Sequence, residues 1–221
     1  MQLIDLSQTI EPTMNLFSPT APKPRLTEWQ THEDAKQSGH YEDASCAMTE
    51  VQFITSLGTY MDSPYHFNPS GGSIDTLTLE QTVLEGVIVD CTHVKEHQPI
   101  DPDVLDSVDI KDKAVLFHTG WDRYWNQPEY MRFPYLTRAT AEALRDGGAK
   151  LAGVDFLVID DTTNPRRPVH MTLLHNNILI VENLTNLGDI PANTPFMFHA
   201  APVKYKDAAA FPIRAYAVVV E

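Results

Sequence analysis

An aspartate and a histidine stand close together in a turn-rich segment in the first third of the chain. Asp62 and His66 follow Gly58, which permits a tight backbone turn, and Pro64 keeps the residue before it extended. A stiff loop directly after a strand is a common place for catalytic groups. A carboxylate and an imidazole held together bind a metal ion or move a proton. On this motif alone the alternative is structural, with Asp62 capping the turn and His66 bonding locally.

A second histidine and acid pair lies much further along the chain. His170 precedes an apolar segment at 178–181 that is typical of a buried strand, and Glu182 ends it. A carboxylate buried there needs a cation or hydrogen-bond donors, because an unpaired buried charge is costly. A solvated strand end, with Glu182 as an ordinary surface carboxylate, is the alternative. The chemical interpretation requires this pair to meet Asp62 and His66 in space, around a shared cation or water.

Other histidines and aromatic residues are weaker candidates. His93 and His97 have a spacing that suits zinc on a helix, but their polar, proline-broken surroundings predict a surface loop. His118 ends a short apolar strand and is a candidate for a pocket wall. Trp121 and Trp125 form an aromatic cluster that suits stacking on a planar substrate, and core or interface packing is the alternative.

The elements that must position these residues are mostly strands, with helices between them. This order predicts an α/β fold with one mixed sheet and flanking helices. Residues 12–48 start with several prolines and continue with polar residues, so we expect an extended arm or a lid there. The last predicted strand is almost entirely apolar and is expected to be covered on both faces. The predicted strands are 3–6, 50–55, 87–91, 114–118, 151–155, 178–181 and 213–220.

Two capping patterns predict helices between the strands. Thr78 and Gln81 form a capping box for a short helix that ends at Gly86. Thr137 caps a longer amphipathic helix that stops at Gly147.

The composition is that of a globular protein with an acidic balance. The 221 residues are 43% hydrophobic and carry a formal net charge of −14. This charge argues against nucleic acid and against anionic membrane surfaces, because both need clustered Lys and Arg. We therefore expect one domain over residues 1–221 and a small molecule as its partner.

The cysteines and the apolar segments indicate a cytoplasmic protein. Cys46 and Cys91 are too few for a disulfide framework and are expected to be reduced thiols. The first residues lack the pattern of a signal peptide, and no apolar run has the length of a membrane span.

The turn-rich segment matches a longer pattern, His-x-Gly-Thr-His-x-Asp-x-Pro-x-His, at every named position except the first two histidines. On it and on later motifs in the same order, the chain resembles the cyclase family, which includes bacterial kynurenine formamidases and isatin hydrolase. The likeness covers nearly the whole chain. The matching positions are Gly58, Thr59, Asp62, Pro64, His66, 116–121, 153–155, His170, 173–174, 182–184, 186–187, 201–204 and 211–215.

The resemblance implies a fold, an activity and an assembly. It implies the swivelling β/β/α fold and a hydrolase of an amide or of a cyclic amide or ester. N-formylkynurenine, an intermediate of tryptophan catabolism, is the first substrate to expect, and family members are commonly homodimers or homotetramers. Trp121 and Trp125 are expected to take its aryl ring, with Ser56 and His118 as further pocket residues.

Two histidines of the family pattern are replaced in this chain, by Ser56 and Tyr60. In the family those histidines and the aspartate hold a divalent metal, zinc or manganese. A hydroxyl and a phenol are poor neutral ligands, so we expect that position to have reduced occupancy or none. A second position of the family corresponds to Asp62, His170 and Glu182, and we expect zinc, or else manganese, to be held there.

The resemblance also assigns roles in catalysis. His66 falls on the family's proton-transferring histidine, and we expect Tyr60 to donate a hydrogen bond to the developing oxyanion. A metal-free attack by Ser56 with His66 as base is one alternative. A lactone hydrolase, a dehydrating cyclase and a binding protein that has lost catalysis are the others.

Overall fold

A nine-stranded mixed sheet forms the centre of the molecule in the computed structural model, which describes residues 1–219. The strands lie in the order β1-β13-β11-β5-β7-β9-β10-β4-β12. The four strands β5, β7, β9 and β10 are parallel, and each further neighbour is antiparallel. The predicted α/β class, with one domain and a mixed sheet, is therefore confirmed. The strands are β1 (Gln2–Asp5), β4 (Tyr60–Asp62), β5 (Val83–Asp90), β7 (Ala114–His118), β9 (Leu151–Val154), β10 (Leu179–Glu182), β11 (Phe196–His199), β12 (Ala210–Pro212) and β13 (Tyr216–Val219).

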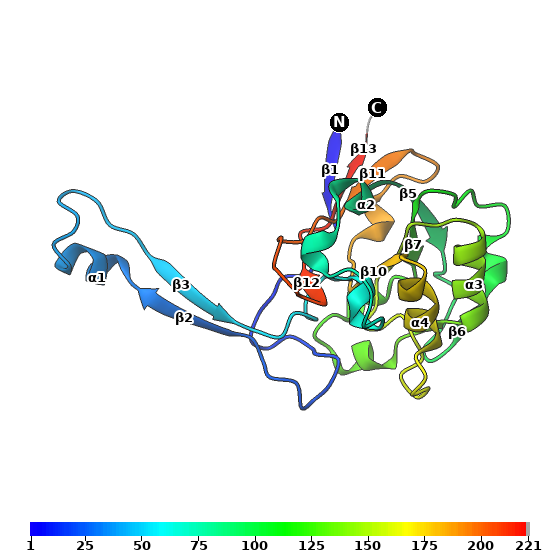
Figure 1. Ribbon diagram of the computed structural model, residues 1–221, viewed down its shortest axis with the longest axis horizontal. Helices are drawn as coiled ribbons and strands as arrows, with labels where there is room; N and C mark the ends of the chain where they lie inside the picture. Colours follow the sequence, from blue (N-terminus) through cyan, green and yellow to red (C-terminus); the bar gives the residue numbers. More distant parts are fainter. Residues whose placement is uncertain (220–221) are drawn as a thin grey trace.

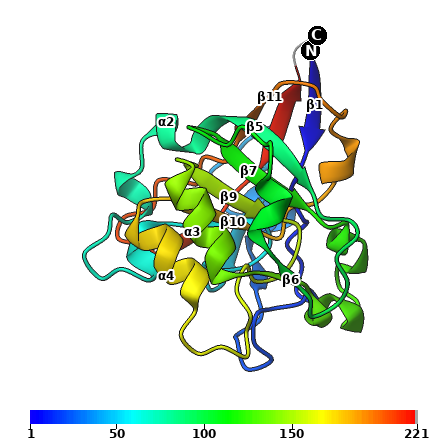
Figure 2. The ribbon, with the colours of Figure 1, turned by 90° about the vertical axis from the view of Figure 1, so that its right-hand side faces the viewer.

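Two helices cover one face of the parallel strands. Helix α3 (Arg138–Asp146) and helix α4 (Pro168–His175) pack side by side in front of this part of the sheet (Figure 2). Helix α2 (Leu79–Thr82) is a single turn. Among residues 1–219, no helix combines the length and the apolar character that crossing a membrane requires. The remaining short elements are β6 (Pro99–Ile100), which pairs with β8 (Tyr135–Leu136), and the 3-10 turns Pro64–His66, Ile74–Thr76, Pro102–Leu105, Trp121–Tyr124, Pro128–Arg132 and Leu187–Asp189.

The apolar core has two layers because side chains alternate along each strand. In β7, Phe117 points to the layer under α3 and α4, whereas Leu116 points to the opposite layer, near Phe198 and Ala217. Both β7 side chains are fully buried, as expected of a parallel strand covered on both faces. Burying a side chain of this size contributes roughly 1.5–3 kcal/mol.

Two predictions about local structure are confirmed with little change. The predicted strand 114–118 has the bounds of β7. The predicted cap of α3 is present, because the backbone N–H of Thr140 donates to Thr137 Oγ1 at 3.2 Å.

The helix predicted to end at Gly86 is wrong in length. The capping box is present, with the N–H of Thr78 donating to Gln81 Oε1 at 2.9 Å. The helix nevertheless lasts one turn, and β5 follows it directly. Gly86 lies within β5 opposite Phe196, and a Cβ there would stand 2.1 Å from the Phe196 ring. The glycine makes room for a cross-strand aromatic ring and is not a helix stop.

The last strand is shorter and less covered than predicted. Strand β13 starts at Tyr216, and its residues alternate between half-buried and buried. It lies beside the edge strand β1, beyond the part of the sheet that α3 and α4 cover, which explains the alternation (Figure 2). Val220, which the prediction included, lies outside the described residues.

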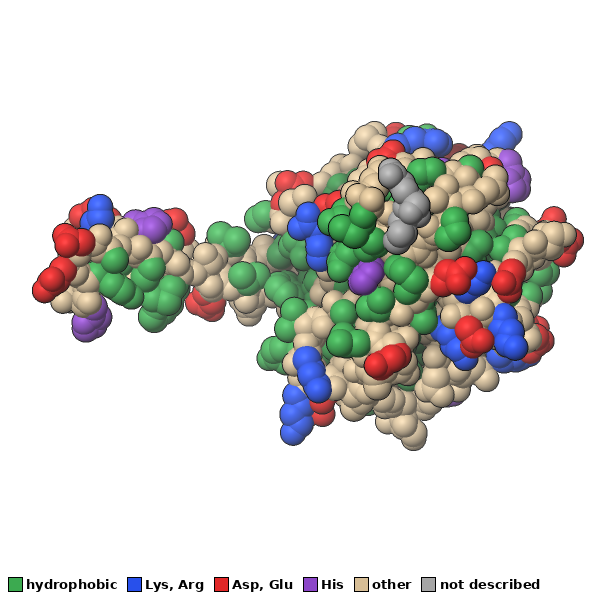
Figure 3. All heavy atoms as spheres, turned by 90° about the horizontal axis from the view of Figure 1, so that it is seen from above, with side chains coloured by type: hydrophobic (Ala, Val, Ile, Leu, Met, Phe, Trp, Pro, Cys, Tyr) green, Lys and Arg blue, Asp and Glu red, His purple; other side chains and the backbone are tan. Residues whose placement is uncertain are grey.

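A long hairpin projects from the body of the molecule (Figure 1). We call residues 25–52 the arm: β2 (Arg25–Gln30) and β3 (Met48–Gln52) pair with each other, and α1 (His32–Gln37) lies at the tip. The strand predicted at 50–55 is therefore misplaced, since β3 belongs to the arm. Almost all residues of both strands are exposed, and acidic side chains gather at the tip (Figure 3).

Candidate functional site

The two candidate segments meet through the pairing of β4 with β10. In this antiparallel pair Asp62 lies opposite Ile180, and Tyr60 lies opposite Glu182. The register brings the side chains of Tyr60, Asp62 and Glu182 to one region of the sheet. The inferred meeting of the two segments is confirmed.

His66 reaches Asp62 from the 3-10 turn that follows β4. The His66 N–H donates to the Ser63 carbonyl at 2.9 Å, which closes the turn. His66 Nε2 then lies 3.6 Å from Asp62 Oδ1. The His66 side chain is 30% exposed while that of Asp62 is fully buried, so the imidazole separates the carboxylate from solvent.

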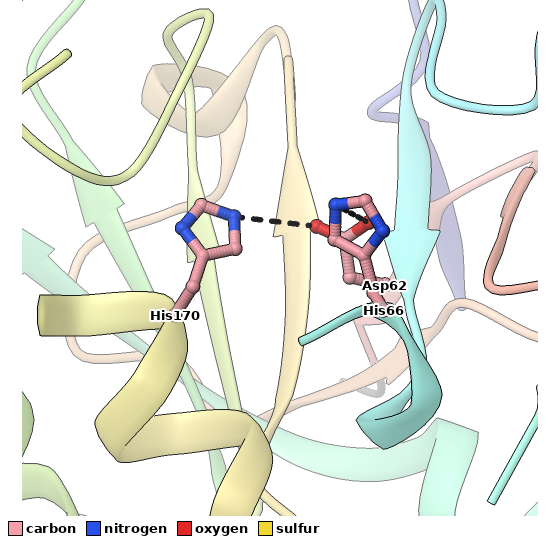
Figure 4. A group of neighbouring side chains, drawn as sticks. All are labelled: Asp62, His66 and His170. Carbon is pink, nitrogen blue, oxygen red and sulfur yellow. Dashed lines mark ion pairs between the residues drawn. The ribbon is translucent and has the colours of Figure 1, made fainter. Parts of the chain in front are cut away.

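Asp160 fixes His170 at the start of α4. Its carboxylate accepts the backbone N–H groups of Val169 and His170, each at 2.9 Å, and lies 2.6 Å from His170 Nδ1. Because a carboxylate only accepts, Nδ1 carries the proton and Nε2 faces the other way. Nε2 lies 3.7 Å from Asp62 Oδ2 (Figure 4). It also lies 3.6 Å from Glu182 Oε1.

Glu182 is buried at the end of β10 and is held by two donors. The N–H of Ile159 donates to Oε1 at 2.7 Å, and the Tyr60 hydroxyl donates to Oε2. Burial, followed by the nearby charge of Asp62, raises the pKa of Glu182, although His170 acts in the opposite direction. Burial and the charges of Glu182 and Asp62 also raise the pKa of Tyr60 well above its usual value.

The carboxylates give this site a strong preference for positive charge. Burial alone lowers the pKa of His170, but the hydrogen bond with Asp160 and the nearby carboxylates of Asp62 and Glu182 outweigh it and raise the pKa to about 10. Both oxygens of Asp62 are buried and accept no hydrogen bond from the described part of the chain. A buried carboxylate without donors is costly unless a cation compensates it.

Three side chains bring ligand atoms close enough to hold one metal ion. One atom each from Asp62, His66 and His170 lies within 4.8 Å of the other two (Figure 4). Carboxylate oxygen and imidazole nitrogen are common zinc ligands, and the Nδ1–H of His170 bound to a carboxylate is the usual outer contact of such a ligand. Together with the unpartnered oxygens of Asp62, this donor set fits a divalent cation. The ligand set expected from the resemblance differs in one member, because it contains Glu182 and not His66.

A cavity of about 230 Å³ opens in front of these residues. Five of its lining residues were predicted from the sequence: Ser56, Tyr60, His66, His170 and Glu182. The other five were not: Phe17, Phe67, Val158, Thr162 and Arg167. These come from loops and from the start of segment 12–48, where the sequence has no pattern that indicates a pocket.

The expected role of Tyr60 as an oxyanion donor does not fit its contacts. Its side chain is buried, and its single hydroxyl proton is donated to Glu182. A phenol has one proton to donate, so none is left for a substrate oxygen. Tyr60 instead holds the carboxylate of Glu182 in place.

Trp121, Trp125 and His118 do not line the cavity. Trp121 is 5% exposed and packs in the core, with its Nε1–H donated to the Tyr130 carbonyl at 3.4 Å. Trp125 packs edge-on against the Tyr130 ring. His118 lines a separate surface hollow. The packing alternative is thus the correct interpretation for the two tryptophans, because their rings face the layer under α3 and α4.

His93 and His97 lie on an exposed loop, as predicted. Asp160 is a site residue that the sequence interpretation missed. The sequence contains a signal for Asp160. Pro168 indicates the start of a helix, and an aspartate shortly before such a start can accept the first free N–H groups of the helix.

A comparison with protein families decides the assignment: the Cyclase family matches residues 4–161, well over half of the chain. The chain belongs to the cyclase family. Among its curated relatives, the kynurenine formamidase of Geobacillus thermodenitrificans is 25% identical over 214 residues, covering 96% of this chain and 95% of that protein. The kynurenine formamidase of Delftia acidovorans is 28% identical over 182 residues, covering 76% and 78%.

Solved structures share the cyclase fold of this chain. An isatin hydrolase bound to the product analogue thioisatinate superposes with a TM-score of 0.85 at 20% identity, over 99% of this chain and 92% of that one. A protein described as a potential metal-dependent hydrolase with cyclase activity has a TM-score of 0.80 at 24% identity, over 100% and 98%. The predicted cyclase fold is confirmed.

Proposed function

We propose that this cyclase-family protein is a metal-dependent hydrolase that cleaves an amide C–N bond in a small molecule. The observation that carries the proposal is the buried carboxylate of Asp62, which accepts no hydrogen bond within residues 1–219 and faces two imidazoles. The names of the two curated relatives given above, both kynurenine formamidases, support hydrolysis of a formamide.

Asp62, His170 and Glu182 would hold the divalent cation, with zinc as the first expectation and manganese as the second. Their side chains are at most 5% exposed. His170 Nε2 lies at almost the same distance from Asp62, 3.7 Å, as from Glu182, 3.6 Å. Glu182 Oε1 accepts one N–H and has a second lone pair for a cation. A cation held there would acidify a bound water and polarise the substrate carbonyl.

His66 is suited to proton transfer because it is the one imidazole of the group that solvent reaches. Its Nε2 lies beside Asp62 and at the wall of the cavity. It takes a proton from the attacking water and returns the proton to the leaving nitrogen, as a general base and then a general acid. The Asp62 carboxylate, 3.6 Å from His66 Nε2, orients the ring.

The cavity favours a compact aromatic substrate. Phe17 and Phe67 supply aromatic wall, and the volume of about 230 Å³ lies below the roughly 300–1,000 Å³ of drug-sized pockets. N-formylkynurenine, with one benzene ring and a formamide, is the proposed substrate.

Metal content of single variants tests the ligand set. We expect Glu182→Gln and His170→Ala to lose most bound metal and most activity, and His66→Ala to keep the metal but lose activity. His93→Ala, on an exposed loop, is the matched control and should change neither. Elemental analysis of protein purified without chelator gives the result. Loss of metal in His66→Ala with retention in Glu182→Gln would place His66, and not Glu182, in the ligand set.

Turnover tests the reaction class. The metal-loaded protein is given N-formylkynurenine, isatin and a lactone, and formate release or ring opening is followed. Preferred ring opening would favour the isatin- or lactone-hydrolase alternative. Absence of metal and of all turnover would favour a binding protein, and loss of activity in Ser56→Ala without bound metal would favour the attack by Ser56.

A further inference from the structure

Two neighbouring arginines lie on the loop before α4 and face different places. Arg167 lines the catalytic cavity, whereas Arg166 lines a separate hollow formed with Arg138 and Met171. Arg167 is the one Lys or Arg among the residues that line the catalytic cavity. This permanent positive charge needs an explanation, because the neighbouring carboxylates Asp62 and Glu182 already pair with His66 and His170.

The backbone at Arg167 is unusual and firmly held. Its φ of 44° and ψ of 58° are left-handed, which is uncommon for a residue other than glycine. The Arg167 N–H donates to the Asn164 carbonyl at 3.3 Å, and its carbonyl accepts from Met171 at 3.0 Å as α4 begins. Pro168 follows directly and starts the helix. The conformation turns Arg167 towards the cavity, while Arg166 stays on the outside.

The guanidinium of Arg167 has donors to spare. One side-chain hydrogen bond is present, from Nη1 to the Asp161 carbonyl at 3.3 Å. Within residues 1–219 no carboxylate lies within ion-pair distance of it. A guanidinium has five N–H donors in a planar fork that matches a carboxylate. The side chain is half-buried, so such a pair would be partly removed from water.

We propose that Arg167 binds a carboxylate of the substrate and makes this enzyme selective for anionic amides. The inference rests on the proposed hydrolase function and narrows its substrate class to an aryl amide with a carboxylate on its side chain. The protein carries a formal net charge of −14, so most of its surface repels an anionic substrate. A local positive charge such as that of Arg167 is therefore needed to bind the substrate carboxylate. The amide is directed to Asp62 and His66, and the carboxylate end is held at the loop before α4.

The test compares two substrates that differ only in charge. The acid is 4-(2-formamidophenyl)-4-oxobutanoate, and the neutral partner is its primary amide; formate release is followed for both. The variants are Arg167→Gln, Arg167→Lys and, as the matched control from the same loop, Arg166→Gln. We expect Arg167→Gln to raise KM for the acid on the order of 10- to 100-fold with little change in kcat. KM for the amide should change less than about threefold, and Arg167→Lys should recover part of the loss.

Other outcomes overturn the proposal. Equal changes in KM for both substrates indicate that Arg167 only supports the loop, and no change for the acid means that its carboxylate binds elsewhere, for example at the metal. If Arg166→Gln has the effect expected of Arg167→Gln, the assignment between the two arginines is wrong.

A binding experiment separates failure of this inference from failure of the hydrolase function. If the wild type hydrolyses neither substrate, the hydrolase proposal fails, and calorimetry with 4-oxo-4-phenylbutanoate and 4-oxo-4-phenylbutanamide then decides about Arg167. The acid should bind the wild type and Arg166→Gln and lose at least about 10-fold in affinity with Arg167→Gln. Equal affinity for all three proteins, or no binding of the acid, refutes the carboxylate site.

Discussion

Tyr60 stands where the cyclase pattern has a histidine, and its contacts explain how the site adapts to the change. Its hydroxyl donates to the buried carboxylate of Glu182, and Tyr60 is not among the three residues whose ligand atoms lie close enough together to hold a metal ion. The resemblance assigns a metal ligand to this position, and in this chain the tyrosine there supports Glu182. Donors of this kind orient a ligating carboxylate and raise its affinity for metal.

Removing the Tyr60 hydroxyl tests this role. Tyr60→Phe should weaken metal affinity roughly 10- to 100-fold, because Glu182 loses the donor to Oε2. At saturating metal, kcat should stay close to that of the wild type. Titration with a competing chelator measures the affinity. Normal affinity with a strongly reduced kcat would instead support the original expectation of an oxyanion donor.

At the scale of single elements, the start of α4 depends on Asp160. The carboxylate accepts the first two free N–H groups of the helix and the Nδ1–H of His170 at once. One side chain therefore joins the stability of the helix to the orientation of a proposed ligand.

Asp160→Ala should disturb both properties together. Unpaired buried N–H groups should lower the free energy of unfolding by about 1–3 kcal/mol each, and metal affinity should fall roughly 10- to 100-fold. Urea unfolding and chelator titration measure the two effects. Asp161→Ala is the control, because within residues 1–219 that carboxylate accepts hydrogen bonds from Thr163 alone. Loss of stability without loss of affinity would show that Asp160 serves the helix alone.

A second buried aspartate controls the turn after β7. Asp155 accepts the N–H groups of Thr119 and Gly120 at 2.9 and 2.7 Å. Burial raises the pKa of Asp155 to about 7, although the hydrogen bonds from Thr119 and Gly120 act against it. The folded state therefore keeps this proton to a higher pH than the unfolded chain, which loses it near pH ~4.

Stability should consequently fall between about pH 4 and pH 7, by on the order of 1.4 kcal/mol per pH unit from this group. Below and above that window its contribution is constant. Asp155→Asn keeps the acceptor for both N–H groups and removes the titration, so its stability relative to the wild type should rise across the window. Urea unfolding at pH 5 and pH 7.5 measures the difference. Parallel pH curves for the two proteins would contradict the assignment.

Several elements were predictable because their signals are local. Strand β7 is a short apolar run, and α3 has a capping threonine and an amphipathic pattern. Gly86 was misread because its partner Phe196 is distant in the chain and no local pattern contains it. The same reason explains the missed lining residues Phe17 and Arg167, which only the folded chain brings to the cavity. Motif order identified the four site residues. The pairing of β4 with β10 that brings them together was not predicted, because the sequence around Asp62 indicates a turn and not a strand.

For the molecule as a whole, the proposed cation should link catalysis to stability. The proposed ligands Asp62, His170 and Glu182 come from β4, α4 and β10, so they converge only in the folded chain. Ligands that bind only the folded state stabilise it, by about 2.7 kcal/mol at one hundred times Kd.

Chelation should therefore lower the melting temperature by roughly 5–10 °C. Calorimetry of metal-loaded and chelator-treated protein measures the shift. Glu182→Gln is the control and should melt at one temperature with or without chelator. An equal shift in that variant would mean that the stabilising metal is bound elsewhere.

The arm gives the molecule its extended shape and exposes apolar side chains. Leu26 and Trp29 are 67% and 66% exposed on a hairpin whose strands pair only with each other in the described residues. The homodimer or homotetramer expected from the resemblance stays a prediction, and light scattering in solution measures it.

The pairing of β4 with β10 also determines at which point of chain synthesis the site can form. Tyr60 and Glu182 are 122 positions apart, so a growing chain has no binding site until translation has passed the second of them. Closing so long a loop is slow and costs entropy. Uptake of metal during refolding would thus report the completion of the fold, and a truncated chain that ends before β10 would capture none at this place.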